Sequence, residues 1–492
     1  MTPSMPYPSP FPLLARLRPT ARALGTLGLV LPLVACTAAR PPAQIAAPAP
    51  TAWQAPLPHG GQLQHLTDWW ARTNDPVLVA LIESAQRISP SLAQARSRVE
   101  QARATQTTAR AALLPTLDAQ AAASRGVTAP VTTPATTAQA GLQAGWEIDL
   151  FGANRATRDA ATERLAGAQA LWHEARVSVA AEVALQVSSL RTCLQQLDVA
   201  GRDAQSRAAT ARLTQDSLRA GFTAPATAAL ASASAAEATA RAAQQRMQCD
   251  VDFKTLVALT GEPEPALRGQ VTAAPSPAYD EARFTIAALP VQVLSQRPDV
   301  YSAEREVAAA AAEVGSAQAQ RWPRLSLTGT VGTAWSRTAG TTTDLSTWSF
   351  GPLALSLPLL DGGRRTAQVD AARARYDEAV AAYQGRVRQA VSEVEQALVR
   401  LQGTAERADS ARTAVQGYQT SFDATEARWR GGLASLVELE DARRTLLAAQ
   451  TTLVALQHER QSAWVALYRA AGGGFDAAAA PSPSASQLPS KS

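Results

Sequence analysis

The residues of this chain that could carry covalent chemistry form no catalytic or metal-binding pattern. The sequence contains no GxSxG, P-loop or CxxC motif, and its four histidines lack the spacing of metal ligands. These are His59, His65, His173 and His458. The sequence therefore predicts a protein that is not an enzyme and that needs no metal or dissociable cofactor.

Two carboxylates do have a spacing that could act electrostatically. Glu438 and Asp441 follow a glycine turn and are three residues apart, so on a helix they share one face. Such a pair would favour cations in front of that face. It could equally be an acidic first turn that the helix dipole stabilises, and the sequence leaves both interpretations open.

Cys36 lies at the end of a targeting segment. Three arginines between residues 16 and 22 precede an apolar stretch, 23–34, that is too short to span a bilayer comfortably. Residues 33–36 read LVAC and resemble a bacterial lipobox, in which the Cys thiol is acylated. An ordinary signal peptide with a cysteine nearby is the alternative.

The N-terminal region is therefore predicted to be a lipoprotein signal peptide, 1–35, followed by the acylated Cys and an extended Ala/Pro-rich linker, 36–69. Translation starts at Met1 or Met5. Because Thr37 rather than Asp follows the cysteine, the chain resembles lipoproteins that are sorted to the outer membrane. Multiple acyl chains matter here, since a single chain anchors only weakly.

Cys193 and Cys249 are candidates for a disulfide. Each is 28 residues from Gly221, one before it and one after it. If Gly221 is the turn of an antiparallel helical hairpin, the two cysteines lie at nearly the same height. In an oxidising compartment they can bond if their Cβ atoms face one another.

The chain repeats one long unit twice. Equivalent positions are separated by 208 to 211 residues along the whole unit. The matched pairs are Pro115 with Pro323, Gly152 with Gly362, Gly221 with Gly432, and Val257 with Val465. A duplicated unit of this length determines the architecture before any single residue does.

Each copy is expected to contain a long helical hairpin. Residues 152–220 and 363–430 lack proline, and apolar residues recur at a and d positions, for example Val394, Leu398, Leu401 and Ala405. At ~1.5 Å per residue each helix is about 100 Å long. Helices over about 225–260 and 435–470 then fold back on them.

Each copy is also expected to contain two short strands. Residues 142–150 and 325–335 alternate apolar and polar side chains, as in a transmembrane strand with one wet face, while partner strands near 117–126 and 347–358 are weaker. Gly351-Pro352 is expected to form a bulge, and 127–138 and 337–346 polar loops. Four strands leave open edges, which lipid does not tolerate, so several protomers must share one barrel.

At this point the chain resembles the TolC/OprM-like outer-membrane factors of tripartite efflux systems, in the acylated NodT-type branch. The most specific strings are LPVQVLSQRPDVYSAEREVAAAAAEVGSAQAQRWPRLSLTG at 289–329 and WRGGLASLVELEDARRTLLAAQ at 429–450. The resemblance implies a homotrimer with a 12-stranded outer-membrane β-barrel continuous with a 12-helix periplasmic α-barrel. The predicted domains are 70–261 and 289–471 as repeats, 262–288 as connector and 472–492 as disordered tail.

The same resemblance implies a passive exit duct for small molecules that an inner-membrane RND-type pump delivers through a periplasmic adaptor. Glu438 and Asp441 would form stacked carboxylate rings at the inner end, although Glu438 replaces a more typical Asp. Trp429 would be an aromatic gate, with plain packing as the alternative. The turns would contact the adaptor, with simple turn chemistry as the alternative; they comprise Gly221, Phe222, Thr223, Gly432, Leu433, Ala434 and Ser435.

Two other functions remain open at this level. A type I protein secretion channel is a close alternative, and a trimeric coiled-coil stalk is a distant one that would place its strands at one chain end. A nucleic-acid partner is disfavoured, because the net charge of +5 is modest and no basic block is present. The substrate is not readable from the sequence.

Overall fold

The computed structural model describes residues 40–46, 49–50, 53–55, 69–70, 75–127, 133–273, 294 and 297–475. These residues divide into two compact units. The sheet unit comprises Leu113–Ala156 and Gly315–Val369 with the segment up to Pro41, and the helical unit comprises Pro42–Ala112, Thr157–Val314 and the chain from Asp370. The signal peptide, Cys36 and residues 476–492 lie outside the described residues.

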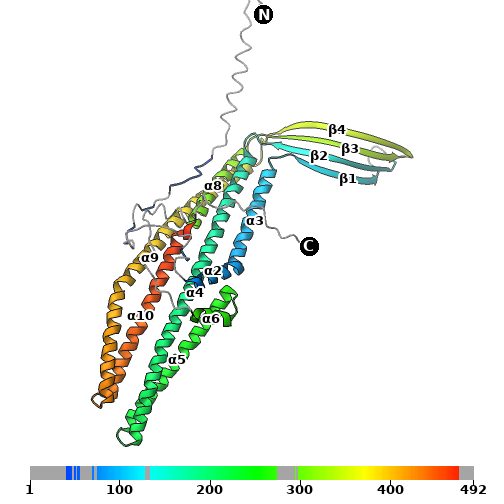
Figure 1. The fold of residues 1–492 in the computed structure, drawn as a ribbon. Coiled ribbons are helices and arrows are strands. Elements are labelled where there is room, and N and C mark those ends of the chain that lie inside the picture. Colours follow the sequence, from blue (N-terminus) through cyan, green and yellow to red (C-terminus); the bar gives the residue numbers. More distant parts are fainter. Residues whose placement is uncertain are drawn as a thin grey trace, which may run out of the picture. The chain divides into compact units, whose positions relative to one another are not determined.

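The sheet unit is a four-stranded antiparallel sheet in the order β1-β2-β3-β4 (Figure 1). Its strands are β1 Thr116–Gly126, β2 Ala135–Ile148, β3 Arg324–Thr338 and β4 Thr341–Ser356. Each copy of the repeat contributes one hairpin, and β2 pairs with β3 to join the copies. The prediction of two strands per copy is confirmed.

The strands are longer than the alternation indicated. Residues 337–346 were expected to be a loop, but β3 and β4 continue to Ala339 and Gly340, which both have positive φ (52° and 87°). That geometry makes a tight hairpin turn whose twist matches the strands. The bulge at Gly351-Pro352 is confirmed, because Leu327 pairs with Leu353 while Gly329 pairs with Phe350.

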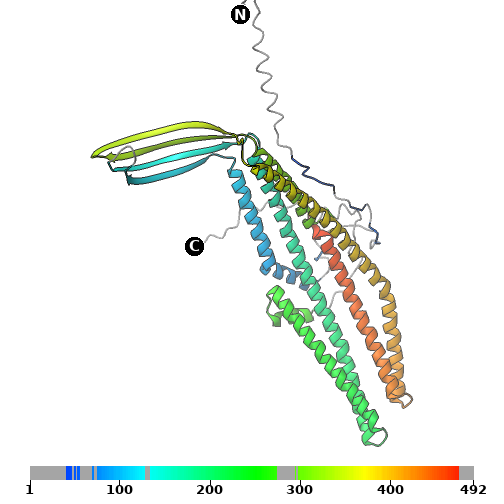
Figure 2. The same cartoon turned by 180° about the vertical axis from the view of Figure 1, so that it is seen from behind.

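The helical unit is dominated by two antiparallel hairpins, visible in both views (Figures 1 and 2). The first joins α4 Ala153–Arg219 to α5 Pro225–Thr260, and the second joins α9 Arg364–Arg430 to α10 Leu436–Ala470. The two long helices each have 67 residues, so each spans about 100 Å as predicted. In the described part of the chain, no helix is both long and apolar enough to cross a membrane.

Shorter helices are also present among the described residues. They are α2 Pro76–Ile88, α3 Pro90–Ala111, α6 Glu264–Ala273 and α8 Pro298–Ala319. The start of α2 follows from its sequence, because Asp75 caps the backbone N–H of Leu78 and proline occupies the first turn. Ser89 caps α3 in the same way.

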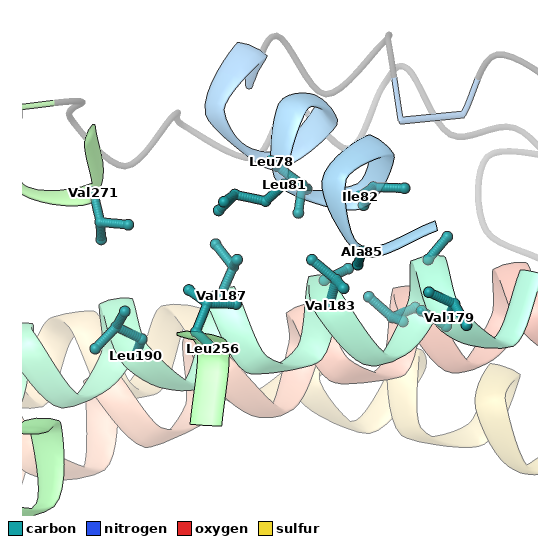
Figure 3. Close-up of a cluster of buried hydrophobic side chains, with 14 of the residues drawn as sticks. Leu78, Leu81, Ile82, Ala85, Val179, Val183, Val187, Leu190, Leu256 and Val271 are labelled. Atoms are coloured by element: carbon teal, nitrogen blue, oxygen red, sulfur yellow. The ribbon is translucent and has the colours of Figure 1, made fainter. Parts of the chain in front are cut away.

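The largest apolar core lies where α2 packs on the middle of α4 (Figure 3). Leu81 of α2 and Val183 of α4 are almost completely buried there, and Leu256 of α5 joins them. Leu267 and Val271 of α6 also belong to this core. The segment 262–288, predicted only as a connector, therefore contains a packed helix in its described part.

One seam position and one boundary predicted from the sequence are wrong in detail. The helix seam passes through the buried Thr404 rather than the exposed Ala405. The C-terminal tail was expected to begin at 472, but Gly472–Gly474 form a 3-10 turn and Phe475 is buried, with its ring centroid 5.3 Å from that of His173. The glycines adopt positive φ, which lets the chain turn back onto α4.

Candidate functional site at the hairpin tips

The two hairpin turns have the same backbone structure. In the first, the N–H groups of Gly221 and Phe222 donate to the carbonyls of Leu218 and Ser217. In the second, Gly432 and Leu433 donate in the same way to Trp429 and Arg428. This is a Schellman motif, and it requires the left-handed φ of +81° and +74° that the two glycines adopt.

The motif leaves one apolar side chain exposed at each tip. Phe222 is 85% exposed and Leu433 is 74% exposed. In a Schellman motif this residue commonly packs on the helix residue five positions earlier, but here those positions are Ser217 and Arg428. Simple turn chemistry therefore explains the glycines but not the exposed apolar side chains.

Glu438 is positioned by the start of α10. Its backbone N–H donates to Ser435 Oγ at 3.2 Å, and its carboxylate accepts the Ser435 N–H at 2.6 Å, which together form a capping box. These backbone and side-chain hydrogen bonds hold the pKa of Glu438 below its usual value. The carboxylate is fully ionised and exposed, and it also performs the structural role considered as the alternative.

Asp441 lies one turn further along the same exposed face of α10. Its carboxylate forms an ion pair with Arg444, and both side chains are largely exposed. The opposite face of this helix is buried through Leu436 and Leu439. The predicted juxtaposition of Glu438 and Asp441 on one helix face is therefore present in the protomer.

Trp429 is half-buried at the end of α9. It packs with Phe422 against a cluster of Ala231, Leu436 and Leu439, which brings both hairpins together near their tips. Packing within the protomer, the alternative to a gate, is therefore one role of this indole.

A buried charged network, which the sequence patterns did not reveal, links the two hairpins. Arg207 of α4 and Arg443 of α10 are only 7% and 3% exposed, and the Glu440 carboxylate lies between them and forms an ion pair with each. Arg207 also pairs with Asp203, at 2.9 Å. Burial lowers the pKa of the Arg443 guanidinium, against the opposing effect of Glu440.

Neutral side chains complete the network. Arg443 donates to Thr210 Oγ1 at 2.6 Å, and Ser234 of α5 donates to Glu440 at 2.7 Å. Residues from both copies therefore contact one carboxylate and two guanidiniums, although Arg443 Nε itself is buried without a hydrogen-bond partner. One feature of the sequence could have revealed this network. Charged residues occupy seam positions of the helices, where apolar residues are expected.

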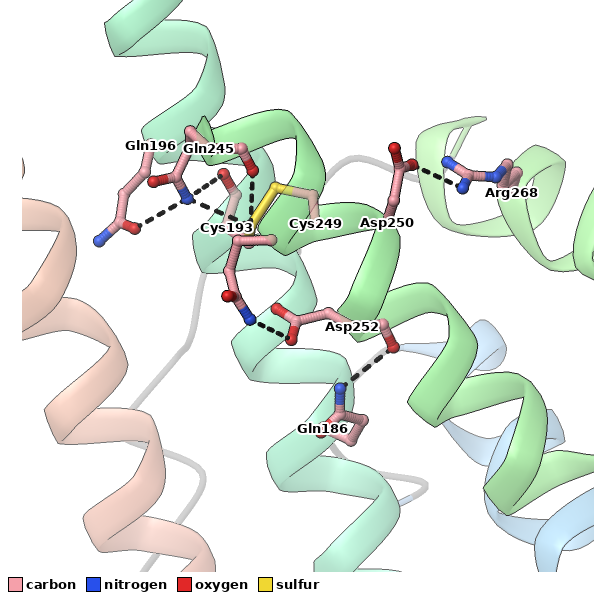
Figure 4. Close-up of a disulfide and its surroundings, with 9 residues drawn as sticks. Gln186, Cys193, Gln196, Gln245, Cys249, Asp250, Asp252 and Arg268 are labelled. Carbon is pink, nitrogen blue, oxygen red and sulfur yellow. Dashed lines mark hydrogen bonds and ion pairs between the residues drawn. A yellow bond between two sulfur atoms is a disulfide. The ribbon is translucent and has the colours of Figure 1, made fainter. Parts of the chain in front are cut away.

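The two cysteines form a disulfide between α4 and α5 (Figure 4). Their Cα atoms are 5.5 Å apart, and Gln245 donates to Cys193 Sγ at 3.2 Å. Both cysteines are buried. The equal spacing about Gly221 places them at one height, as the sequence indicated.

The second hairpin uses the same two positions differently. Adding the offset of 211 that relates Gly221 to Gly432 converts Cys193 and Cys249 into Thr404 and Arg460. In the structure Arg460 donates to Thr404 Oγ1 at 3.2 Å and to the Leu401 carbonyl at 3.0 Å. A covalent link in the first copy thus corresponds to hydrogen bonds in the second.

Residues 297–300, which read RPDV, form a separate set of buried contacts. Arg297 is 6% exposed and binds Asp299, Glu393 of α9 at 2.8 Å and the carbonyl of Ala470 at the end of α10, at 3.0 Å. Although burial alone would raise it, the pKa of Asp299 is held below its usual value by Arg297. These contacts fix the start of α8 to both helices of the second hairpin.

Metal chemistry has no support in the described residues, where no group of three or more His, Cys, Asp or Glu side chains could hold an ion. The lipidation candidate Cys36 lies outside them. The features that remain are a sheet with open edges, paired helical hairpins, exposed apolar tips and an acidic face beside one tip.

Comparison with known proteins identifies the class. A family model described as outer membrane efflux protein matches residues 81–262 and 289–473. The outer membrane protein OprJ of Pseudomonas aeruginosa is 29% identical over 94% of this chain and 97% of its own length. The pyoverdine export outer membrane protein OpmQ of the same organism is 30% identical, covering 92% and 97%.

The fold agrees with this assignment. The structure of the outer-membrane channel OprN superimposes with a TM-score of 0.79 at 26% identity and covers 89% of this chain and 99% of OprN. The chain therefore belongs to the outer membrane efflux protein family. It is an outer-membrane efflux duct, mainly helical with a small β part, as the sequence resemblance predicted.

Proposed function

We propose that three copies of this chain form the passive exit duct of a tripartite efflux system, which conducts small molecules to the outside. The observation that carries the proposal is the composition of the sheet. One row across β2, β3 and β4 is Leu142, Val331 and Trp348, all exposed and apolar. The neighbouring row contains Gln143 and Thr330.

Such a sheet has one face suited to lipid and one suited to water. Its edge strands β1 and β4 have no further strand partner among the described residues. Because the smallest transmembrane barrels have eight strands, one chain cannot close a barrel. Three chains supply twelve strands and six helical hairpins, which can close both parts of the duct.

The tips are proposed to face the periplasmic adaptor, which connects the duct to an inner-membrane RND-type pump. Phe222 and Leu433, with the turn residues around them, supply the apolar contacts. Glu438 and Asp441 from three protomers form acidic rings beside Trp429, which narrows the inner end. Acylation of Cys36 anchors the chain to the outer membrane, and the chain performs no covalent chemistry.

The cargo is proposed only as small molecules. The names of the relatives differ in this respect, since one is a pyoverdine export protein and another a toluene efflux pump protein. We place selectivity mainly in the pump. A type I protein secretion channel is the alternative, and a requirement for an ATP-driven exporter instead of an RND pump would favour it.

The first test is the mass of the protein extracted in detergent from the outer-membrane fraction, measured by light scattering with correction for bound detergent. A particle with three times the mass of the 51.6 kDa chain, less its signal peptide, supports the shared duct. A stable monomer contradicts it, because one sheet would then leave two edges open in lipid.

The acidic rings have a test of their own. The Glu438→Gln and Asp441→Asn variants remove the charges, and Gln at position 438 can still complete the capping box. In planar bilayers the double variant should lose cation preference, seen as a smaller reversal potential in a salt gradient. An unchanged reversal potential would leave Glu438 with its capping role only.

A further inference from the structure

The apolar core of the first hairpin ends partway along α5. Phe253 and Leu256 of this helix are almost completely buried in the large core. In the distal half of α5, residues 225–248, the buried side chains are those of Ala228, Ala231 and Ala238, and the rest of this fully described stretch is not buried. At ~1.5 Å per residue the distal half is about 36 Å long. Cys249 follows it directly and is buried again.

The second hairpin has larger apolar side chains at the equivalent places. Three leucines of α10 are buried there, Leu439, Leu446 and Leu456. Subtracting the offset of 211 that relates the two turns converts them into Ala228, Ala235 and Gln245 of α5. A buried leucine removes more apolar surface from water than an alanine or a half-buried glutamine does. The distal half of α5 therefore gains less from packing than the matching part of α10.

Two polar contacts connect the distal half of α5 to α4. Arg207 donates to Ser234 Oγ at 2.6 Å, and Arg241 pairs with Asp203 at 3.8 Å. The Arg241 side chain is partly exposed, and ion pairs of this kind contribute little. Point contacts such as these do not replace a continuous apolar seam.

The disulfide lies where the apolar core ends (Figure 4). It joins Cys193 to Cys249, which are 56 residues apart in the sequence, and so closes a loop that contains the whole distal part of the first hairpin. Gln245, at the position of a leucine in the second hairpin, lies beside the sulfur atoms and donates to Cys193 Sγ. A crosslink limits how far the two ends of such a loop can separate. The bond therefore holds α5 against α4 at the point where side-chain packing becomes weak.

We propose that the Cys193–Cys249 disulfide replaces the missing apolar core of the first hairpin, so that this chain must be oxidised before its first tip is held in place. Oxidation removes two protons and two electrons from the two thiols as the bond between their sulfur atoms forms. A protein or small molecule that carries a disulfide accepts them through a mixed disulfide and becomes a dithiol. Without the bond, residues 225–248 separate locally from α4, whereas α10 keeps its packing.

The burial of the sulfur atoms determines when this oxidation takes place. Cys193 is 4% exposed and Cys249 is 2% exposed. Disulfide exchange requires direct access to a sulfur atom, which a protein oxidant does not have in the packed hairpin. Oxidation therefore precedes the packing of α5 on α4, and the finished bond is shielded from reductants.

Hydrogen exchange of the purified full-length protein tests this role of the bond. In the variant with Cys193→Ser and Cys249→Ser, residues 225–248 should exchange about tenfold faster than in wild type, while 436–459 of α10 should not change. Cys193→Ala with Cys249→Ala is the matched control without buried hydroxyls and should give the same result. Wild-type exchange of 225–248 in either double variant would overturn the inference. Faster exchange throughout both hairpins would also overturn it, because the bond would then hold the whole helical unit.

Leucine substitutions test what the bond replaces. Ala235→Leu and Gln245→Leu, added to the double serine variant, restore two apolar positions that α10 has, and both sites are half-buried. They should slow the exchange of 225–248 again by about fivefold. Ala229→Leu with Gln244→Leu is the control, since both sites are exposed on the same helix, and it should change nothing. If the first pair does not slow exchange, the bond does not stand in for an apolar core.

The order of events is tested in cells with a membrane-permeable dithiol reductant. When the reductant is present during synthesis, maleimide should label Cys193 and Cys249 of the new chain, as counted by peptide mass mapping. When it is added after the protein has folded, both residues should stay unlabelled. Equal labelling in the two cases would contradict the proposed order. The inference does not depend on the duct, because exchange and labelling are measured within one chain whether or not three chains assemble.

Discussion

Arg297 and Asp299 form an ion pair whose side chains are only 7% and 11% exposed. The folded protein lowers the pKa of Asp299, so the carboxylate stabilises the fold above its unfolded pKa of about 3.9 and loses that contribution as pH falls through the folded value. Asp299→Asn should lower the free energy of unfolding at pH 7 by about 2 kcal/mol, since it removes one of the two carboxylates that pair with the buried Arg297 guanidinium.

The measurement is thermal unfolding of both proteins between pH 7 and pH 3. The difference between wild type and Asp299→Asn should narrow below about pH 4, where the carboxylate of the unfolded chain begins to protonate, and should disappear below the lower folded pKa. Asp370→Asn is the control, because Asp370 pairs with Arg373 at 3.9 Å on the surface and should contribute less than about 1 kcal/mol. A difference that is constant with pH would rule out the ionised pair as its source.

Individual residues differ in how far the sequence determines their role. The turn glycines and the cysteine pair were predictable, because both follow from the position of one turn and the equal spacing about it. Arg207 and Glu440 were not, because they are 233 residues apart and meet only when the two hairpins pack. Local patterns carry no information about which charged residue will face which across such a distance.

At the scale of helices, the network around Glu440 couples the hairpins. Glu440→Gln removes the charge between two buried guanidiniums and should lower the free energy of unfolding by about 3 kcal/mol. Hydrogen exchange should rise locally at 203–214 and 436–446. Because Glu459 binds Arg407 on the exposed surface, Glu459→Gln should change stability by less than about 1 kcal/mol. Equal effects of the two variants would mean that the buried network does not hold the hairpins together.

The duplication also predicts that a disulfide can be engineered into the second hairpin. If the hairpins share one geometry, Thr404→Cys combined with Arg460→Cys places two cysteines like Cys193 and Cys249, whose Cα separation of 5.5 Å suits a disulfide. Peptide mass mapping after mild oxidation should then find a new 404–460 link. Thr404→Cys with Glu459→Cys is the control, since residue 459 points elsewhere on the helix. A persistent dithiol at 404 and 460 would show that the hairpins pack in different registers.

The ends of the strands could not be predicted from the alternation of apolar and polar residues. Alternation located the centre of each strand, but β2 begins at Ala135 and β4 at Thr341, within Thr-rich stretches that looked like loops. Threonine is compatible with strands, and cross-strand pairing to an already formed neighbour extends them. Composition alone does not report the presence of that neighbour.

At the scale of the whole molecule, the duplication places an exposed apolar residue at the same turn position of each hairpin. A trimer would therefore present Phe222 and Leu433 three times each, as a ring that is costly to leave in water. If an adaptor covers this ring, Phe222→Ser and Leu433→Ser should each weaken its binding about tenfold, the scale of an apolar anchor at an interface. The turns should persist, because the Schellman hydrogen bonds use backbone atoms only.

Co-purification of the adaptor after crosslinking in cells measures this effect, with oligomer mass as the check that the duct still forms. Leu213→Ser is the control, since Leu213 is 52% exposed on α4 but lies outside the turns. Loss of the adaptor with all three variants would indicate general destabilisation. Full retention with Phe222→Ser and Leu433→Ser together would mean that the adaptor is held elsewhere. In that case the exposed residues need another explanation than docking, because their own turns give them no apolar partner.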